Sequence, residues 1–518
     1  MMRVAVILAG LVAGVIALTL AEGLLRLLDV APTSPSDPFA GFSSTVPLFE
    51  PARRSDGAAI YRASPARLLS PEGHIDEPQR EFLATKLPAT FRVFVVGESS
   101  AAGFPYGTGY AFSSWLERRL TAELPDWHVE VVNAAMPGYS SRRQLVVVRE
   151  LAAYAPDLLI VYSGHNELAE RRFYAHLLDR DPRIFRLQEL LVETRLYRLV
   201  STLVPAPRAR PSIPEFTVDD VRDIAQMFAV VDERVAGKVY PTPRELAYAE
   251  MLYRFDLVEM ARVMRHAGAR VMLLTLSQNF ADWPPGASSH RPDLADDDLT
   301  RWNHYVAEGD ALADRHDDCL HALERYAKAL TIDDQFAALV YRVASCERRL
   351  GRFNEAYAHF RRASDLDRVP HGAPTSFNDD VRIVAQEEGA LFVDVEKLLE
   401  RESAYGLVGD DLFVDFCHPN LRAHQRIAQE LVQQLQVAGV PVPAERWTPG
   451  RYVDPDSGSL YAADPTLRTK EHLARAATCM LARRDDCARA EVKHVLATDP
   501  DDRWARQMQQ ALGQRDVR

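Results

Sequence analysis

This chain lacks the residue groupings that mark most metal and nucleotide sites. Its five cysteines do not combine with histidine at zinc-site spacing, and it has no Walker-type or dinucleotide-type glycine loop. It also has no excess of positive charge, because 61 lysines and arginines against 73 aspartates and glutamates give a formal net charge of -12. A nucleic-acid partner favours a basic surface, so we predict no nucleic-acid partner, no metal ion and no cofactor.

What the chain does have is the composition of a folded protein with more than one domain. Hydrophobic residues make up 47% and charged residues 26% of its 518 residues, values that are typical of globular proteins. A chain of this length is too long for one ordinary core, so two or three domains are expected.

The N-terminus is predicted to be a membrane anchor. Met1-Met2-Arg3 precedes an uncharged apolar run at 4–21, which is short for a spanning helix and long for a signal-peptide core. A cleaved signal sequence is the alternative, because Thr19-Leu20-Ala21 loosely resembles a cleavage site. We expect residues 1–30 to remain as a single-pass anchor in the cell inner membrane. The positive-inside rule then leaves the bulk of the chain on the periplasmic side.

Two further segments have an unusual composition. Residues 31–90 are rich in proline and show little periodicity, which predicts an extended stalk that wraps onto the next domain; a disordered linker is the alternative. Residues 171–210 hold nine arginines beside an apolar helical stripe. This pattern predicts a helical cap over the site, and the alternative is a basic amphipathic helix on the membrane surface.

Short apolar runs alternate with helical patterns through much of the chain. The runs are rich in β-branched and aromatic residues and fall at 91–96, 129–133, 158–162, 270–274 and 390–395. Strands that alternate with helices predict an α/β fold with a parallel sheet and helices on both faces. Sheets of this kind build their sites beyond the C-terminal ends of the strands, and we expect each chemical block to lie there.

Residues 303–368 have a helical pattern with an internal repeat. An Ala-x3-Tyr/Phe-x2-Ala pattern that begins at Ala322 recurs 34 residues later at Ala356, with Gly351 at the turn between two helices. This period resembles the tetratricopeptide repeat. A third unit of similar pattern includes Ala488, near the C-terminus. Because repeats need neighbours to bury their faces, we expect the C-terminal hairpin to pack against the inserted pair in one array.

Four of the five cysteines flank helix turns. Cys479 and Cys487 flank the turn of one hairpin, and Cys319 and Cys346 flank the turn between neighbouring repeats. An exported chain can oxidise such pairs if the Cα atoms come within about 7 Å, so we predict both disulfides; four buried thiols are the alternative. Cys417 is expected to be a buried free thiol.

Four short blocks in a fixed order carry the chemistry. Ser99 lies in a tight turn between strand and helix, where free main-chain N–H groups favour a developing negative oxygen. Gly138 offers a main-chain N–H that no side chain shields, and the Asn166 carboxamide can donate to the same oxygen. In isolation, each of these blocks fits a turn or a helix cap equally well.

The last block supplies an Asp/His pair. The spacing of Asp415 and His418 lets the carboxylate accept from one ring nitrogen while the other nitrogen points toward a serine. We therefore predict that Ser99, Asp415 and His418 are catalytic, and that Ser99, Gly138 and Asn166 form the oxyanion hole.

Ser, Gly, Asn and Asp-x-x-His in this order resemble the SGNH branch of the GDSL hydrolases. The resemblance implies a flavodoxin-like three-layer α/β/α fold and ester hydrolysis or acyl transfer. This chain departs from the family where it reads Gly-Glu-Ser instead of Gly-Asp-Ser and Gly-His-Asn-Glu instead of Gly-x-Asn-Asp. Beyond the stalk we predict a hydrolase domain in two parts, at 91–300 and 371–445. A helical insertion at 301–370 separates these parts, and a C-terminal helical hairpin follows at 446–518.

Three functions fit this sequence. The first is a membrane-anchored, extracytoplasmic serine ester hydrolase, and the second is an O-acyltransferase that acts on cell-envelope glycan or exopolysaccharide, as some relatives do. The third is an inactive scaffold that binds a protein partner through its helical repeats. The intact catalytic positions favour an enzyme. Its expected partners are an ester-bearing substrate, macromolecular in view of the repeats, a protein at the repeats, and the membrane at the N-terminal helix.

Overall fold

The structure is a computed structural model of the whole chain. It describes residues 2–28, 30, 39, 41–64, 81–168, 170, 182–192, 194–203, 242–315, 317–370 and 372–515. The parts of the predicted stalk at 31–38 and 65–80, and of the arginine-rich segment at 171–181 and 204–210, lie outside these residues.

A five-stranded parallel sheet forms the centre of the protein. Its strands are β4 (Thr90–Gly97), β5 (His128–Asn133), β6 (Leu158–Tyr162), β7 (Arg270–Leu274) and β8 (Leu391–Val393). All residues of β4 and β6 are buried, as expected for strands that are covered on both faces. The strand order β5-β4-β6-β7-β8 is the flavodoxin-like order 2-1-3-4-5, so the predicted sheet and fold class are confirmed.

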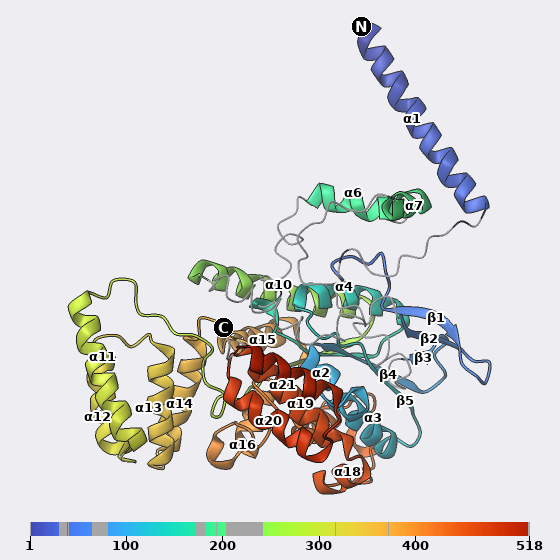
Figure 1. The fold of residues 1–518 in the computed structure, drawn as a ribbon. Coiled ribbons are helices and arrows are strands. Elements are labelled where there is room, and N and C mark those ends of the chain that lie inside the picture. Colours follow the sequence, from blue (N-terminus) through green and yellow to red (C-terminus); the bar gives the residue numbers. More distant parts are fainter. Residues whose placement is uncertain are drawn as a thin grey trace.

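Helices cover both faces of this sheet (Figure 1). On one face lie α4 (Ser141–Leu151), α10 (Pro243–His266) and α15 (Ser376–Glu388), and on the other lie α3 (Phe112–Glu123) and α17 (Leu421–Val437). The helix α16 (Val395–Glu402) follows β8 directly, and the one-turn helix α2 (Ser99–Ala102) follows β4. The result is the predicted three-layer α/β/α arrangement.

A second, smaller sheet lies in the segment that we predicted to be a stalk. The strands β1 (Phe49–Arg53), β2 (Ala59–Ala63) and β3 (Glu81–Leu83) pair antiparallel in that order. Phe49 and Phe82 are buried in the same core as the central sheet. These residues do wrap onto the domain as predicted, but they do so as paired strands. The proline-rich composition of the segment gave no indication of strands.

The N-terminal helix α1 (Met2–Leu27) lies apart from the main body, together with α6 (Pro182–Val192) and α7 (Arg195–Leu203). The Glu22 carboxylate accepts from the main-chain N–H of Arg195 and of Leu196, which fixes α7 on α1. Over the part of the chain that the structure describes, none of the helices combines the length and hydropathy of a membrane span, so the predicted transmembrane helix is not confirmed. The described part of the arginine-rich segment contacts α1 through α7, and its role as a cap over the site stays a prediction.

The inserted segment between β7 and α15 forms four helices. They are α11 (Asp296–Asp310), α12 (Cys319–Leu330), α13 (Ala337–Arg349) and α14 (Phe353–Asp365), and Gly351 sits at the α13–α14 turn with φ +74°. The predicted repeat positions Tyr326 and Phe360 are buried inside this unit. The hairpin geometry agrees with the prediction, and the assignment to the tetratricopeptide class remains a prediction.

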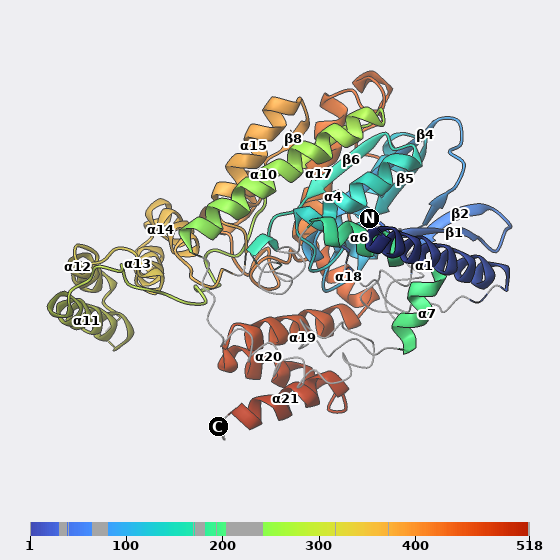
Figure 2. The ribbon, with the colours of Figure 1, turned by 90° about the horizontal axis from the view of Figure 1, so that it is seen from above.

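The C-terminal helices form a separate unit. It consists of α18 (Ser457–Ala463), α19 (Thr466–Leu481), α20 (Asp485–Thr498) and α21 (Arg503–Arg515). Figures 1 and 2 show it beside the domain of the central sheet, apart from α11–α14. The expected single array is therefore wrong. Each unit buries its own core, and the loop after β7 contributes Phe280 to one core and Trp283 to the other.

The cysteines follow the prediction in part. Cys479 and Cys487 form the predicted disulfide, with the Cα atoms 5.9 Å apart. Cys319 and Cys346 face each other from α12 and α13 but are free and buried, so the second predicted disulfide is not formed. Both cysteines belong to the hydrophobic core of the inserted helices, and this shared burial explains why they lie close together without a disulfide bond. Cys417 is a buried free thiol, as expected.

Candidate active site

Ser99 begins the short helix α2 directly beyond the C-terminal end of β4. The turn needs glycine on both sides of it, since an added Cβ at Gly97 would lie 2.2 Å from the Tyr162 carbonyl oxygen. At Gly103, where φ is +90°, an added Cβ would lie 2.5 Å from the Gly107 carbonyl oxygen. The predicted role of both glycines in a sharp turn with close packing agrees with this geometry.

The structure brings Ser99 together with the Asp/His pair. The His418 Nε2 atom lies 2.8 Å from the Ser99 Oγ atom, although the two residues are 319 positions apart in the chain. The His418 Nδ1 atom lies 2.7 Å from one Asp415 carboxylate oxygen and 2.8 Å from the other. This is the arrangement in which a neutral imidazole can take a proton from a serine while the carboxylate fixes its tautomer.

Asp415 is completely buried and is held as a carboxylate. Burial alone would raise the pKa of its carboxyl group, but the adjacent His418 and the main-chain N–H groups of His418 and Cys417 lower this pKa below its ordinary value. The charged carboxylate can therefore orient the imidazole and stabilise its protonated form.

The loop that carries this pair is not at the end of a strand, contrary to our expectation for every block. The helix α16 and a further loop separate β8 from Asp415. Within this loop, only an isolated bridge between Phe413 and Pro419 gives a strand-like pairing among the described residues. The Ala423 N–H donates to the Asn420 side-chain oxygen, and this cap starts α17, as predicted for a helix after Pro419.

Gly138 and Asn166 lie on two neighbouring loops, after β5 and β6. Gly138 has φ +75°, which favours glycine, and no atom lies within 4 Å of an added Cβ. The Asn166 side-chain amide donates weakly to the Tyr139 carbonyl, 3.4 Å away, so the two loops touch. The Gly138 N–H is thus unshielded by a side chain of its own, and the role of Gly138 and Asn166 as oxyanion donors stays a prediction.

Glu98, the residue that departs from the family pattern, holds the loop after β6. Its carboxyl oxygens accept from the main-chain N–H of Gly164 at 2.6 Å and of His165 at 2.9 Å, and from the Ser163 hydroxyl at 3.1 Å. Burial raises the pKa of this carboxyl group to about 7. The longer side chain of Glu thus keeps the turn hydrogen-bonded. The residues that it binds directly precede Asn166 in the chain.

A buried ion pair holds the loop of Gly138. Arg143, in the first turn of α4, pairs with Glu170, and the two side chains are only 4% and 2% exposed. The Arg143 guanidinium also donates to the Gly138 carbonyl and lies 4.0 Å over the Tyr139 ring. Glu170 accepts from the Ser140 N–H at 3.0 Å. Since the Glu170 N–H donates to the Asn166 carbonyl, this pair links both predicted oxyanion donors.

Aromatic rings border the His418 imidazole. The Phe104 ring lies 4.6 Å from it and is partly exposed, and the Phe416 ring lies 5.7 Å from it. Cys417 is bound to Ser100: its carbonyl accepts from the Ser100 hydroxyl, and burial raises the pKa of its thiol well above the ordinary value. An acyl group bound at Ser99 would therefore meet an apolar wall beside the imidazole.

Within the described residues, one group of side chains is compact enough to share a metal ion, and it consists of Asp415, Cys417 and His418. A metal needs the cysteine as thiolate, whereas the raised pKa of Cys417 keeps its proton. The His418 Nδ1 atom already lies within hydrogen-bond distance of both Asp415 carboxylate oxygens. The group therefore fits a hydrogen-bonded pair better than a metal site.

The sequence pointed to the residues that lie at the reacting centre but not to those that support it. Glu98 could have been found, because it is a single acidic residue at the end of an apolar strand. Nothing in the spacing of Arg143 and Glu170 indicates that they pair. Arg475, described below, lies in a helix that looked unrelated to the site.

Residues 95–336 match the GDSL-like Lipase/Acylhydrolase family, a range that includes Ser99, Gly138 and Asn166 and ends before Asp415. A comparison with curated protein sequences gives no significant match.

Solved structures of esterases and lipases match this chain with low sequence identity and low TM-scores. One is an acetylxylan esterase from Geobacillus stearothermophilus, with 12% identity over 67% of this chain and 96% of the other, and a TM-score of 0.28. Another is a GDSL-like lipase from Bacteroides thetaiotaomicron, with 10% identity over 69% and 93% and a TM-score of 0.29. Because these values are low, the chemistry of the site rests on its own geometry.

Proposed function

We propose that this chain is a serine ester hydrolase that works through an acyl-enzyme on Ser99, and the match of residues 95–336 to the GDSL-like lipase/acylhydrolase family supports this. The observation that supports this best is the 2.8 Å contact between the His418 Nε2 atom and the Ser99 Oγ atom, with Asp415 behind the ring. A serine hydroxyl becomes a good nucleophile when a positioned base takes its proton, and this pair meets that requirement.

In the proposed reaction, the Ser99 oxygen forms a bond with the ester carbonyl carbon as its proton passes to His418. Collapse of the tetrahedral intermediate breaks the bond to the alcohol, which leaves with the proton from His418. Water then attacks the acyl-enzyme by the same steps, releases the acid and restores the serine. Ester and water are thus converted to acid and alcohol, and His418 carries the proton in each transfer.

The oxyanion would be stabilised by the main-chain N–H groups of Ser99 and Gly138 and by the Asn166 side chain. Loss of one donor of this kind typically lowers kcat by about 10²–10³-fold. Asn166→Ala should show a loss in this range, with little change in KM, since the hydrogen bond strengthens only as charge develops.

The experiment that tests this function is intact-protein mass spectrometry after treatment of the full chain with a fluorophosphonate probe. We expect one adduct on the wild type, none on Ser99→Ala, and one on the control Ser345→Ala, whose half-buried serine lies in α13. A folded wild type without an adduct would contradict the proposal and favour a scaffold. An adduct together with acyl transfer to an added sugar, at the expense of hydrolysis, would favour the O-acyltransferase.

We further propose that the chain is held at the inner membrane, with its bulk in the periplasm. The support is the uncharged run at 4–21 after Arg3, and the exposed apolar side chains of α6 beside its arginines, such as Leu187 and Leu190. Cell fractionation tests this location. Recovery of the protein in membranes after alkaline carbonate washing, with digestion by protease in spheroplasts, is expected; recovery in the soluble fraction would contradict it.

A further inference from the structure

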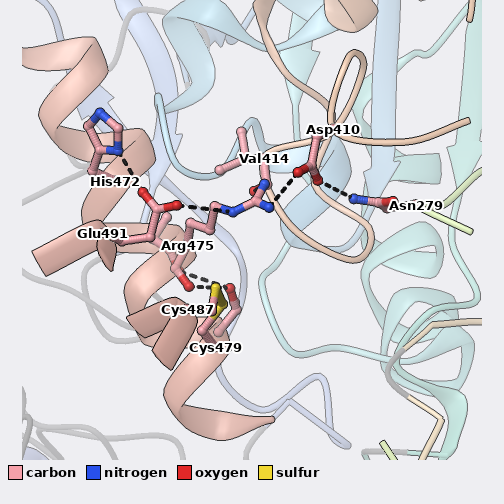
Figure 3. The surroundings of a disulfide bond; sticks show 10 residues. Asn279, Asp410, Val414, His472, Arg475, Cys479, Cys487 and Glu491 are labelled. Atoms are coloured by element: carbon pink, nitrogen blue, oxygen red, sulfur yellow. Dashed lines mark hydrogen bonds and ion pairs between the residues drawn. A yellow bond between two sulfur atoms is a disulfide. The ribbon is translucent and has the colours of Figure 1, made fainter. Parts of the chain in front are cut away.

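The C-terminal helical unit lies against the loop that carries Asp415 and His418. This unit falls outside the range of the family match, and its disulfide lies at the α19–α20 turn (Figure 3). Its contacts with the loop are of two kinds, apolar and polar, and both involve residues that border Asp415.

The apolar contacts are made at both ends of the loop. Val414 and Leu421, which precede and follow the segment from Asp415 to Asn420, share one buried cluster with Leu467 and Ala474 of α19. Phe416 packs against the core of the C-terminal unit, where its ring lies 5.8 Å from Trp283. The side chains on both sides of Asp415 are therefore held by α19 and its neighbours.

The polar contacts centre on Arg475 in α19. Its guanidinium donates to the Val414 carbonyl at 3.1 Å, one residue before Asp415, and pairs with Asp410 at 2.5 Å, as Figure 3 shows. From the other side, Glu491 of α20 pairs with Arg475 at 3.3 Å. Arg475 thus joins the hairpin to the start of the loop.

The chain extends through two more side chains. The His472 ring binds Glu491 at 2.7 Å, and the Asn279 side-chain amide donates to Asp410, also at 2.7 Å. The main-chain N–H of Asn279 donates to the Phe416 carbonyl at 2.8 Å. The loop after β7 and the C-terminal hairpin therefore grip the same segment from different sides.

From these contacts we infer that the α19–α20 hairpin is a support for the catalytic loop, and that Arg475 is a positioning residue for the Asp415–His418 pair. The inference rests on the proposed function. The loop depends on contacts from neighbouring segments because it does not continue from a strand of the sheet, and among the described residues its strand-like pairing is the isolated bridge between Phe413 and Pro419. Arg475 supplies a bond to the last carbonyl before Asp415.

A displacement of this loop would act on the reaction step more than on substrate binding. The distance from His418 to Ser99 decides whether the proton can transfer, and an error of about 1 Å can lower the rate about 10²-fold. The Arg475 guanidinium contacts Asp410, Glu491 and the Val414 carbonyl, and none of these is Ser99 or a proposed oxyanion donor. Its loss should therefore lower kcat and leave KM nearly unchanged.

The test compares the full-length wild type with Arg475→Met and Arg475→Lys. The measurements are kcat and KM for p-nitrophenyl acetate, the rate of fluorophosphonate labelling, and the melting temperature. We expect Arg475→Met to lower kcat and the labelling rate by about ten- to a hundredfold, with KM within about twofold of the wild type. Arg475→Lys keeps a positive charge near Asp410 and should recover part of this loss.

The matched control is Arg382→Met. Arg382 is partly exposed like Arg475 and pairs with Glu396 at 2.7 Å and Asp394 at 3.1 Å, between α15 and α16. The Arg382→Met substitution should lower the melting temperature about as much as Arg475→Met does, without changing kcat. If Arg475→Met does not fold, Asp410→Asn removes the other end of the same ion pair and should lower kcat in the same way.

The outcomes separate the two proposals. A wild type that neither hydrolyses the ester nor reacts with the probe would refute the proposed function itself. An active wild type whose Arg475→Met and Asp410→Asn variants keep kcat, or lose it only in proportion to stability as Arg382→Met does, would overturn the positioning role.

Discussion

The buried pair of Arg143 and Glu170 allows stability and catalysis to be separated by experiment. Removing one partner of a buried ion pair leaves an uncompensated charge and costs about 3–5 kcal/mol of unfolding free energy. Both side chains are nearly inaccessible, at 4% and 2% exposure, so Arg143→Met and Glu170→Gln should each lose an amount in this range. Replacing both partners at once removes the unpaired charge, and much of the stability should return.

Catalysis should respond differently. Arg143 also donates to the Gly138 carbonyl, and no neutral pair restores that bond. The Gly138 N–H would then be free to move from the position where an oxyanion forms, and kcat should stay about 10–10²-fold low in the double variant. Urea unfolding gives the free energies, and hydrolysis of p-nitrophenyl acetate gives kcat.

The pair of Arg92 and Glu130 provides the matched control. It lies 2.7 Å apart, is 1% and 9% exposed, and sits near the N-terminal ends of β4 and β5, away from Ser99. The same substitutions there should change stability alone. If the Arg143/Glu170 double variant regains kcat together with stability, the pair serves folding only, and the reasoning about the oxyanion loop is refuted.

Three further predictions concern other parts of the molecule. Asp415→Asn should lower kcat by about 10⁴-fold with little change in KM, since the wrong imidazole tautomer would face Ser99; a loss below tenfold in steady-state hydrolysis would contradict this. Burial raises the pKa of Glu98 from about 4.5 to about 7, so its contribution to stability is fully present below about pH 4.5 and is lost as the pH rises through 7. The unfolding free energy of the wild type, measured with urea, should therefore decrease between pH 5 and pH 8 by up to about 3 kcal/mol more than that of Glu98→Gln. An equal decrease in both proteins would refute the direction of this pH dependence. Finally, a thiol reagent should find three sulfhydryls in the unreduced, denatured protein and five after reduction, whereas a single one would mean that Cys319 and Cys346 do pair.

The central sheet could be predicted from sequence because burial on both faces leaves a plain signal. The runs at 158–162 and 270–274 coincide with β6 and β7, since only apolar, extended residues can fill such positions. The contact of Ser99 with His418 was also predictable, because Ser99 lies in the turn after β4 and the Asp-x-x-His spacing indicates a catalytic pair.

Other features depend on contacts between segments that are distant in sequence. The strands β1–β3 have no continuous apolar run and are stable because Phe49 and Phe82 reach the main core. Cys319 and Cys346 have the spacing of a pair, but their positions in a packed core do not require a bond. Arg475 binds a loop about sixty residues earlier, and no local pattern records such a contact.

The distance along the chain between Ser99 and His418 has a consequence for biosynthesis. The serine and the oxyanion donors lie in the first third of the chain, whereas the histidine follows 319 residues after the serine and its loop is gripped by helices that come later still. A ribosome-bound or truncated chain that ends before residue 415 thus carries Ser99 without Asp415 and His418. Under the proposed function, such a chain would hydrolyse no ester until nearly all of the protein had been made.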